Sequence, residues 1–380
     1  MTKKAPSTNL QVPTQVVHDI RHLIEEARSL VAVTVNAALT TLYWQIGKRI
    51  NEEILKGERA EYGALILPTL SAKLVPLYGE GFSERNLARM IKFSEAFSDS
   101  LIVVTLSRQL SWSHFIELLP LKQYLQRDFY AEMCRVERWS VRALRKKIDS
   151  MLYERTALSK KPEELIRQEL DTLRNEDQLT PDLVFRDPYF LDFLNLKGAY
   201  SERDLEAAIL RELEAFILEL GAGFTFVARQ KRMIIDGEDH YLDLLFYHRK
   251  LKRLIAVELK LGKFRAADKG QLELYLRWLE RYEQEPGEGA PLGLILCAEG
   301  GHEKIELLRL EPSGIRVAEY LTELPPREVL GRKLHTAIEE ANQRYESKEP
   351  ASVEESHSTA EEKAVIRKSP TVRPVKRGKS

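Results

Sequence analysis

The chain contains few cysteines, two in 380 residues, and has no net charge, because 58 basic residues balance 58 acidic ones. Cys134 and Cys297 lie far apart and lack the short spacing of a zinc site. This excludes a disulfide scaffold and a cysteine-rich metal fold, and it favours free thiols in a reducing cytoplasm. The zero net charge gives no global attraction to polyanions, so any nucleic-acid contact must depend on local clusters of charge.

Long hydrophobic runs are also missing. The longest apolar stretch, from Leu30 to Trp44, is interrupted by Thr and Asn and is shorter than the ~20 residues that a membrane-spanning helix needs. The first residues lead into no apolar segment, so we do not expect secretion or a membrane partner.

A chain of this length is typical of two domains with tails. Apolar residues at helical spacing after Thr14, and the expected N-caps Ser83 and Ser140, predict an all-helical first half. This half would bind DNA or a partner, or would mediate self-association. The expected segments are disordered residues 1–13, a helical domain over 14–165, a connector over 166–185, an α/β domain over 186–345 and a disordered basic tail over 346–380.

The second half alternates helical and strand patterns. Asp187–Leu194 predicts a short apolar helix, and an amphipathic helix follows Ser201 and ends at Gly221. A further helix follows Asp268, and a terminal helix covers 326–346. The expected strands are Phe224–Ile235, Tyr241–Tyr247, Leu254–Leu259, Leu292–Cys297 and Gly314–Leu321. The fold class is therefore α+β overall, with a mixed sheet flanked by helices in the second domain.

Two acids face each other in the central hairpin of this domain. A turn centred between Lys250 and Leu251 sets Asp243 opposite Glu258, where the Cβ atoms of paired residues lie about 4.5–5.5 Å apart. Like charges repel at that distance unless a divalent cation lies between them. Lys260 shares a face with Glu258, and this combination suits metal-assisted hydrolysis of a phosphodiester. The alternative is an edge hairpin whose charges face water.

A second charged feature lies between Arg135 and Lys161, where nine basic residues accompany three acidic ones. We expect Arg142, Arg145 and Lys146, on the helix after Ser140, to contact phosphates of a nucleic acid. The alternative is a solvated helix face.

The order helix, three strands, helix, strand, with Asp243 on one strand and Glu258-Leu-Lys260 on the next, resembles the PDDEXK nuclease superfamily. Several segments, including those around Tyr43–Lys48 and Gly221–Arg232, resemble the YhcG-like PDDEXK family over roughly residues 15–345. The resemblance implies that Asp243 and Glu258 bind Mg²⁺, with the carbonyl of Leu259 as a further ligand and Mn²⁺ as a substitute ion.

The resemblance also assigns the remaining site residues. Lys260 would orient the attacking water. Glu206 would be the acid that the superfamily carries on a helix, and Glu202 is the alternative for this position. Gln271 matches an auxiliary position of the superfamily on the helix that follows the central hairpin. Arg229 and Gln230 would touch DNA. The expected function is a Mg²⁺-dependent DNA endonuclease in restriction, recombination or repair. The alternative is a noncatalytic nucleic-acid-binding or assembly protein that uses the nuclease fold as a scaffold.

Overall fold

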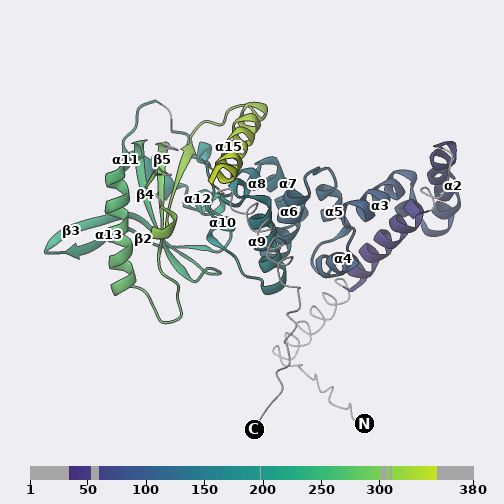
Figure 1. The fold of residues 1–380 in the computed structure, drawn as a ribbon, viewed down its shortest axis with the longest axis horizontal. Coiled ribbons are helices and arrows are strands. Elements are labelled where there is room, and N and C mark those ends of the chain that lie inside the picture. The colour runs from purple at the N-terminus through teal and green to yellow at the C-terminus, as the bar shows by residue number, and fades with distance from the viewer. Residues whose placement is uncertain are drawn as a thin grey trace, which may run out of the picture.

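The computed structural model describes residues 34–52, 60–196, 198–300, 305, 307, 308 and 310–348. The predicted disordered N-terminus and nearly all of the predicted basic tail lie outside these residues. The molecule is elongated, with the sheet at one end and α2 and α3 at the other (Figure 1). Within the described residues, no helix is long and apolar enough to cross a membrane.

Helices form the part of the chain before Tyr189, and the described residues of this part contain no named strand. Ser140 caps α7 as predicted, since its hydroxyl accepts a hydrogen bond from the backbone N–H of Ala143 at 3.2 Å. Residues 34–52 are helical, followed by α2 (Ala60–Tyr78), α3 (Glu84–Ala96), α4 (Ser100–Ser107), α5 (Trp112–Leu118), α6 (Tyr124–Glu137), α7 (Val141–Asp149), α8 (Leu152–Arg155), α9 (Glu163–Glu176) and α10 (Pro181–Val184).

Helix α9 occupies the segment predicted as a connector. Its residues Ile166, Leu170 and Leu173 are buried at helical spacing, and the helix packs against α6. Arg174 of α9 also binds the buried Glu132 of α6, with 2.7 Å between Nε and Oε1. The segment is therefore packed onto the helical body rather than extended between two bodies.

The second part is a six-stranded mixed sheet in the order β1-β6-β5-β4-β3-β2. Strands β2, β3 and β4 are antiparallel, whereas β4, β5, β6 and β1 run parallel. This confirms the predicted α+β fold class. The strands are β1 (Tyr189–Phe190), β2 (Phe224–Ile235), β3 (Glu238–His248), β4 (Arg253–Lys263), β5 (Leu292–Glu299) and β6 (Ile315–Leu321), and the helices are α11 (Glu202–Arg211), α12 (Leu213–Leu220), α13 (Ala266–Tyr282) and α15 (Arg327–Lys348).

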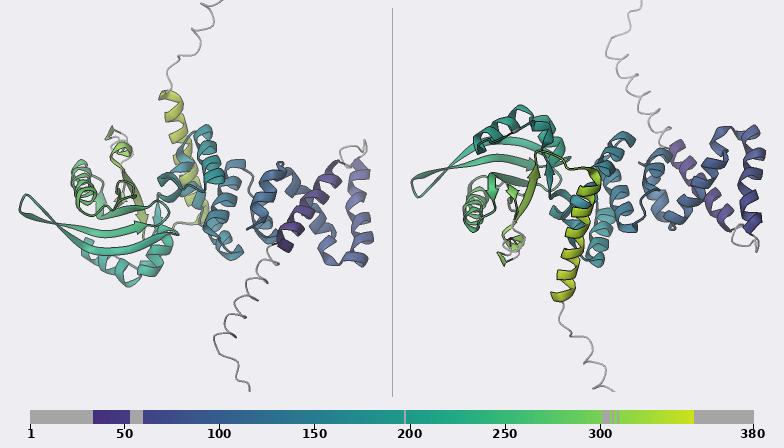
Figure 2. Two further views of the ribbon diagram at one scale, coloured as in Figure 1. Left: turned by 90° about the horizontal axis from the view of Figure 1, so that it is seen from below. Right: turned by 90° about the horizontal axis from the view of Figure 1, so that it is seen from above.

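Each face of the sheet has its own helical cover. Phe246 and Val257 belong to a core with α11 and α12, whereas Leu245 and Ala256 belong to a core with α13. This alternation follows from the two-residue period of a strand, which sends successive side chains to opposite faces. The views from below and above show the helices on opposite sides of the strands, and the β2–β3 hairpin extending beyond the rest of the sheet (Figure 2).

The β3–β4 hairpin has the register predicted from the sequence. Its pairs run from Leu244↔Val257 to His248↔Arg253, around the turn at residues 249–252. The ladder ends at Leu244↔Val257, so Asp243 and Glu258 lie directly beyond its last pair.

Two predicted helices differ from the structure. Only Asp192–Leu194 of the Asp187–Leu194 segment is helical, as a short 3-10 helix. Tyr189 and Phe190 form β1 instead, because they pair with the exposed edge of β6 and bury their rings between sheet and helices. The helix after Ser201 is divided at Glu212, whose ψ of 34° interrupts the α-helical hydrogen bonding between α11 and α12.

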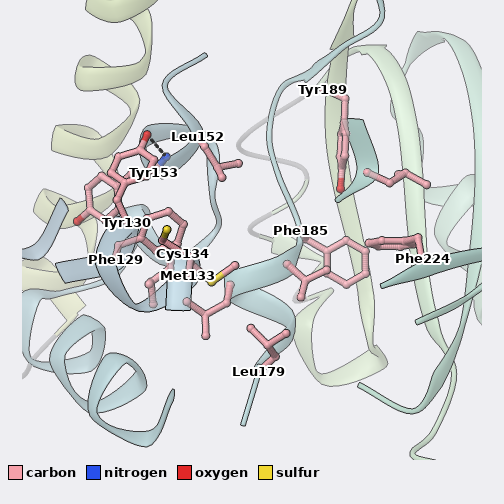
Figure 3. Packing of buried hydrophobic residues seen from close by; sticks show 14 of the residues in the cluster. Phe129, Tyr130, Met133, Cys134, Leu152, Tyr153, Leu179, Phe185, Tyr189 and Phe224 are labelled. Carbon is pink, nitrogen blue, oxygen red and sulfur yellow. Dashed lines mark hydrogen bonds between the residues drawn. The ribbon is translucent and has the colours of Figure 1, made fainter. Parts of the chain in front are cut away.

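A continuous apolar core joins the helical part to the sheet. Phe129 and Tyr153 on the helical side belong to the same buried cluster as Phe185 and Phe224 on the sheet side (Figure 3). The buried Arg155 crosses this junction, with its Nη1 2.6 Å from Oε1 of Glu219 on α12. Cys134 and Cys297 are free and buried. Burial raises the pKa of both thiols to about 12, which keeps them protonated and inert.

Candidate active site

The end of the β3–β4 ladder holds Asp243, Glu258 and Lys260 together. Beyond Val257 the ladder no longer pairs, and the side chain of Asp243 accepts a hydrogen bond from the backbone N–H of Leu259, 2.9 Å from N to Oδ2. Lys260 donates from Nζ to Oε2 of Glu258 at 3.1 Å. The predicted grouping of two carboxylates and one ammonium is therefore present in the structure.

Burial and neighbouring negative charge raise the pKa of both carboxylates. The pKa of Glu258 is raised to about 7, first by burial and then by the negative charge of Asp243, while Lys260 opposes the change. Burial also raises the pKa of Asp243. For Lys260, burial lowers the pKa, but the charge and hydrogen bond of Glu258, together with the charges of Glu202 and Asp243, outweigh burial and the pKa is raised. Without a cation, this site resists the full ionisation of its acids.

The donor atoms at this point fit a hard divalent cation. Glu258 is 2% exposed, and its Oε1 atom is buried without a hydrogen-bond partner among the described residues. A buried carboxylate oxygen without a partner is costly unless an ion binds it. No group of three His, Cys, Asp or Glu side chains able to hold a metal occurs in the described ranges. An ion here would therefore take two carboxylates, a backbone carbonyl and waters, which suits Mg²⁺.

Helix α11 brings both candidate helix acids to this site. The Oε2 atom of Glu206 lies 2.9 Å from Nε2 of Gln230, which in turn lies 3.1 Å from Oδ1 of Asp243. Glu202 instead accepts a hydrogen bond from the backbone N–H of Leu261, at 3.2 Å. Burial and the charge of Asp243 raise the pKa of Glu206. Glu206 is thus linked to Asp243 through Gln230, whereas Glu202 is hydrogen-bonded to the strand just past Lys260, and its charge acts on both Asp243 and Lys260.

Helix α13 contributes Gln271, whose side-chain amide is hydrogen-bonded within the helix. Its Nε2 atom donates to the hydroxyl of Tyr275 at 2.9 Å. Tyr275 is 3% exposed, and burial raises its pKa, with the negative charge of Glu258 acting in the same direction. The sequence analysis missed Tyr275 because it occupies an apolar helix position and has no motif of its own. A shallow pocket beside Lys260 is lined by Glu202, Lys260, Gly262, Lys263, Arg265 and Asp268.

The two predicted DNA contacts on β2 differ in their surroundings. Arg229 is exposed, and its charge acts on Glu206. Gln230 is directed into the site, because its amide is hydrogen-bonded to both Glu206 and Asp243. Gln230 is exposed as well, so it links the carboxylates to the surface of the molecule.

The predicted basic surface is smaller than its sequence suggests. Five of its nine basic residues form ion pairs within the helical part or across the junction, namely Arg135, Arg145, Arg155, Lys160 and Lys161. In the pair of Arg145, 2.6 Å separates its Nη2 atom from Oε1 of Glu117. Arg142 and Lys146 are exposed on α7. These pairings were invisible to a count of charges, because the partners lie far away in the sequence.

Two segments of the chain match described protein families. Residues 19–155 match the DUF1016 N-terminal domain, and residues 182–335 match the YhcG PDDEXK nuclease domain. The chain is 37% identical over 352 residues to "Putative nuclease YhcG" of Escherichia coli (strain K12), with 84% of this chain and 93% of that protein covered. The chain belongs to the YhcG-type PDDEXK nuclease family. Its YhcG-type domain, residues 182–335, contains Asp243, Glu258 and Lys260.

Two solved structures also match part of the chain. A repair endonuclease from Pyrococcus abyssi is 23% identical with a TM-score of 0.24, and covers 34% of this chain and 50% of its own. EndoMS in its apo form is 19% identical with a TM-score of 0.23, and covers 34% of this chain and 49% of its own. The chain thus matches about half the length of each solved relative.

Proposed function

We propose that this YhcG-type nuclease is a Mg²⁺-dependent DNA endonuclease that acts in the cytoplasm in restriction, recombination or repair. The observation that carries the proposal is the buried Oε1 atom of Glu258, which lacks a partner in the described structure and belongs to a carboxylate on which the negative charge of Asp243 acts. Such an arrangement is unfavourable without a cation and becomes favourable with one. The ion would be held by Asp243, Glu258 and the carbonyl of Leu259, and Mn²⁺ would replace Mg²⁺.

The ion would neutralise phosphate charge and lower the pKa of a bound water. The chain's own residues supply the rest of the chemistry. Lys260, held beside Glu258, would orient the attacking water and stabilise negative charge that develops on the phosphate. Burial of Glu258 excludes bulk water, which strengthens each of these electrostatic interactions.

DNA binding would involve the exposed Arg142 and Lys146 on α7 and the exposed Arg229 beside the site. Exposed basic side chains attract phosphates and release counterions. A role of the helical part in self-association is a separate proposal, which the size of the full chain in solution would test.

The deciding experiment is nicking of supercoiled plasmid by the full chain with Mg²⁺, compared with EDTA and with Asp243→Ala. We expect nicking only by the wild type with metal. A panel of linear duplex, single-stranded and branched DNA and RNA would then define the substrate. If DNA is bound equally by both proteins and neither nicks it, the noncatalytic alternative replaces this proposal.

A further inference from the structure

Gln230 has a backbone conformation that is unusual for its residue type. Its φ angle is +44°, in the left-handed region that residues other than glycine rarely adopt. Pairing of β2 with β3 is present on both sides, at Arg229 and Lys231, so the distortion is confined to this residue. A non-glycine residue held this way within a strand indicates that surrounding contacts determine its conformation.

The side chain of Gln230 explains what this conformation achieves. Its Nε2 atom lies 2.9 Å from Oε2 of Glu206 and 3.1 Å from Oδ1 of Asp243. Carboxylates accept hydrogen bonds and do not donate them, so only the NH₂ end of the amide satisfies both, which fixes its orientation. Both amide hydrogens are thereby used. A neutral nitrogen lies between two acids that belong to different elements, α11 and β3.

A second metal ion, if the site held two, would lie between Glu206 and Asp243, where the Gln230 amide lies. In two-metal phosphodiester hydrolysis, the ions lie about 3.5–4 Å apart and share ligands. If the proposed function holds, the first ion lies between Asp243 and Glu258. A second ion would need Asp243 and Glu206, and the amide of Gln230 now fills the space between those two side chains.

We propose that Gln230 makes this active site a single-ion site, by bridging Glu206 and Asp243 in place of a second divalent cation. Glu206 then acts as a positioning residue, which holds the Gln230 amide against Asp243 rather than binding the metal. The inference rests on the proposed function, because it assumes that Asp243 binds the first ion. The charge of Asp243 contributes to the raised pKa of Glu206, which supports a close approach of the two acids across the amide.

The test counts bound ions rather than activity. The full chain is titrated with Mn²⁺, and free Mn²⁺ is measured by electron paramagnetic resonance for wild type, Gln230→Ala, Gln230→Glu and Asp243→Ala. We expect one ion per wild-type chain above the Asp243→Ala background, and two for both Gln230 variants. Gln230→Glu should bind the second ion more tightly, because it adds a carboxylate of the same size. The matched control is Gln168→Ala, an exposed glutamine on α9, which should bind one ion.

The outcomes separate this inference from the proposed function. Two ions in wild type, or one ion in both Gln230 variants, would overturn the single-ion assignment and leave a metal-dependent nuclease intact. No ion in wild type above the Asp243→Ala background would overturn both. Circular dichroism of each variant checks folding, and Gln230→Glu preserves side-chain volume if Gln230→Ala does not fold.

Discussion

The raised pKa of Glu258 predicts how the stability of the metal-free protein depends on pH. Its pKa is about 7 in the folded chain, against a usual value of 4.5. The folded state therefore holds the proton more tightly than the unfolded state does. The contribution of Glu258 to stability is fully present below pH ~4.5 and is lost as the pH rises towards ~7. A pKa difference of about 2.5 corresponds to a loss of about 3 kcal/mol.

The assay is urea unfolding in EDTA at several pH values between 4.5 and 8, for wild type and for Glu258→Gln. The glutamine does not titrate, so the difference between the two proteins isolates this carboxylate. We expect wild type to lose stability relative to Glu258→Gln across this window. Mg²⁺ should restore wild-type stability at pH 8 and leave Glu258→Gln unchanged, because the ion binds the ionised carboxylate. A flat difference, or one of opposite slope, would refute the reasoning.

Four further expectations concern single groups. Asp243→Ala should abolish both plasmid nicking and the Mg²⁺ binding measured by calorimetry. Its metal-free melting temperature should stay level or rise, because the change removes a repulsion between buried acids. Retained nicking would exclude this hairpin as the active site. Lys260→Ala should keep Mg²⁺ binding in the same calorimetric assay but lose turnover at least 100-fold, on the order expected for a group that stabilises transition-state charge. Changing Arg142 and Lys146 together to Ala should reduce the slope of log K for DNA binding against log salt concentration by about 2, because about one counterion is released per phosphate contact. An unchanged slope would mean that this face of α7 is only solvated. Gln230→Gly should resist urea better than Gln230→Ala by about 1 kcal/mol, because only glycine adopts a positive φ without strain.

The pattern of the sequence was sufficient to predict strands β2 to β6 and the register of the central hairpin. The strand predicted at Phe224–Ile235 has the bounds of β2 in the structure. The turn position fixed the β3–β4 register, because a hairpin's pairing follows from where its turn is centred. Asp243, Glu258 and Lys260 were therefore identified together, since local rules of strand geometry already placed them on one face.

The predictions that needed tertiary contacts were less successful. Whether the basic residues near Arg155 face solvent depended on acids such as Glu219, 64 residues away along the chain. The short strand β1 formed only because β6 offers it an edge to pair with, and its own sequence favoured a helix. Propensity describes a segment alone, whereas burial and ion pairing depend on what the fold brings beside it.

Gln230 shows the division between sequence and tertiary structure most clearly. Its place in a strand was evident from the sequence, and the family resemblance implied a contact with DNA. Its positive φ and its bonds to Glu206 and Asp243 arise only when α11, β2 and β3 assemble. The sequence by itself determined which acids and which lysine share the hairpin, because strand periodicity is local. Only the tertiary structure decided which neutral group lies between Glu206 and Asp243, because that depends on three elements meeting in space.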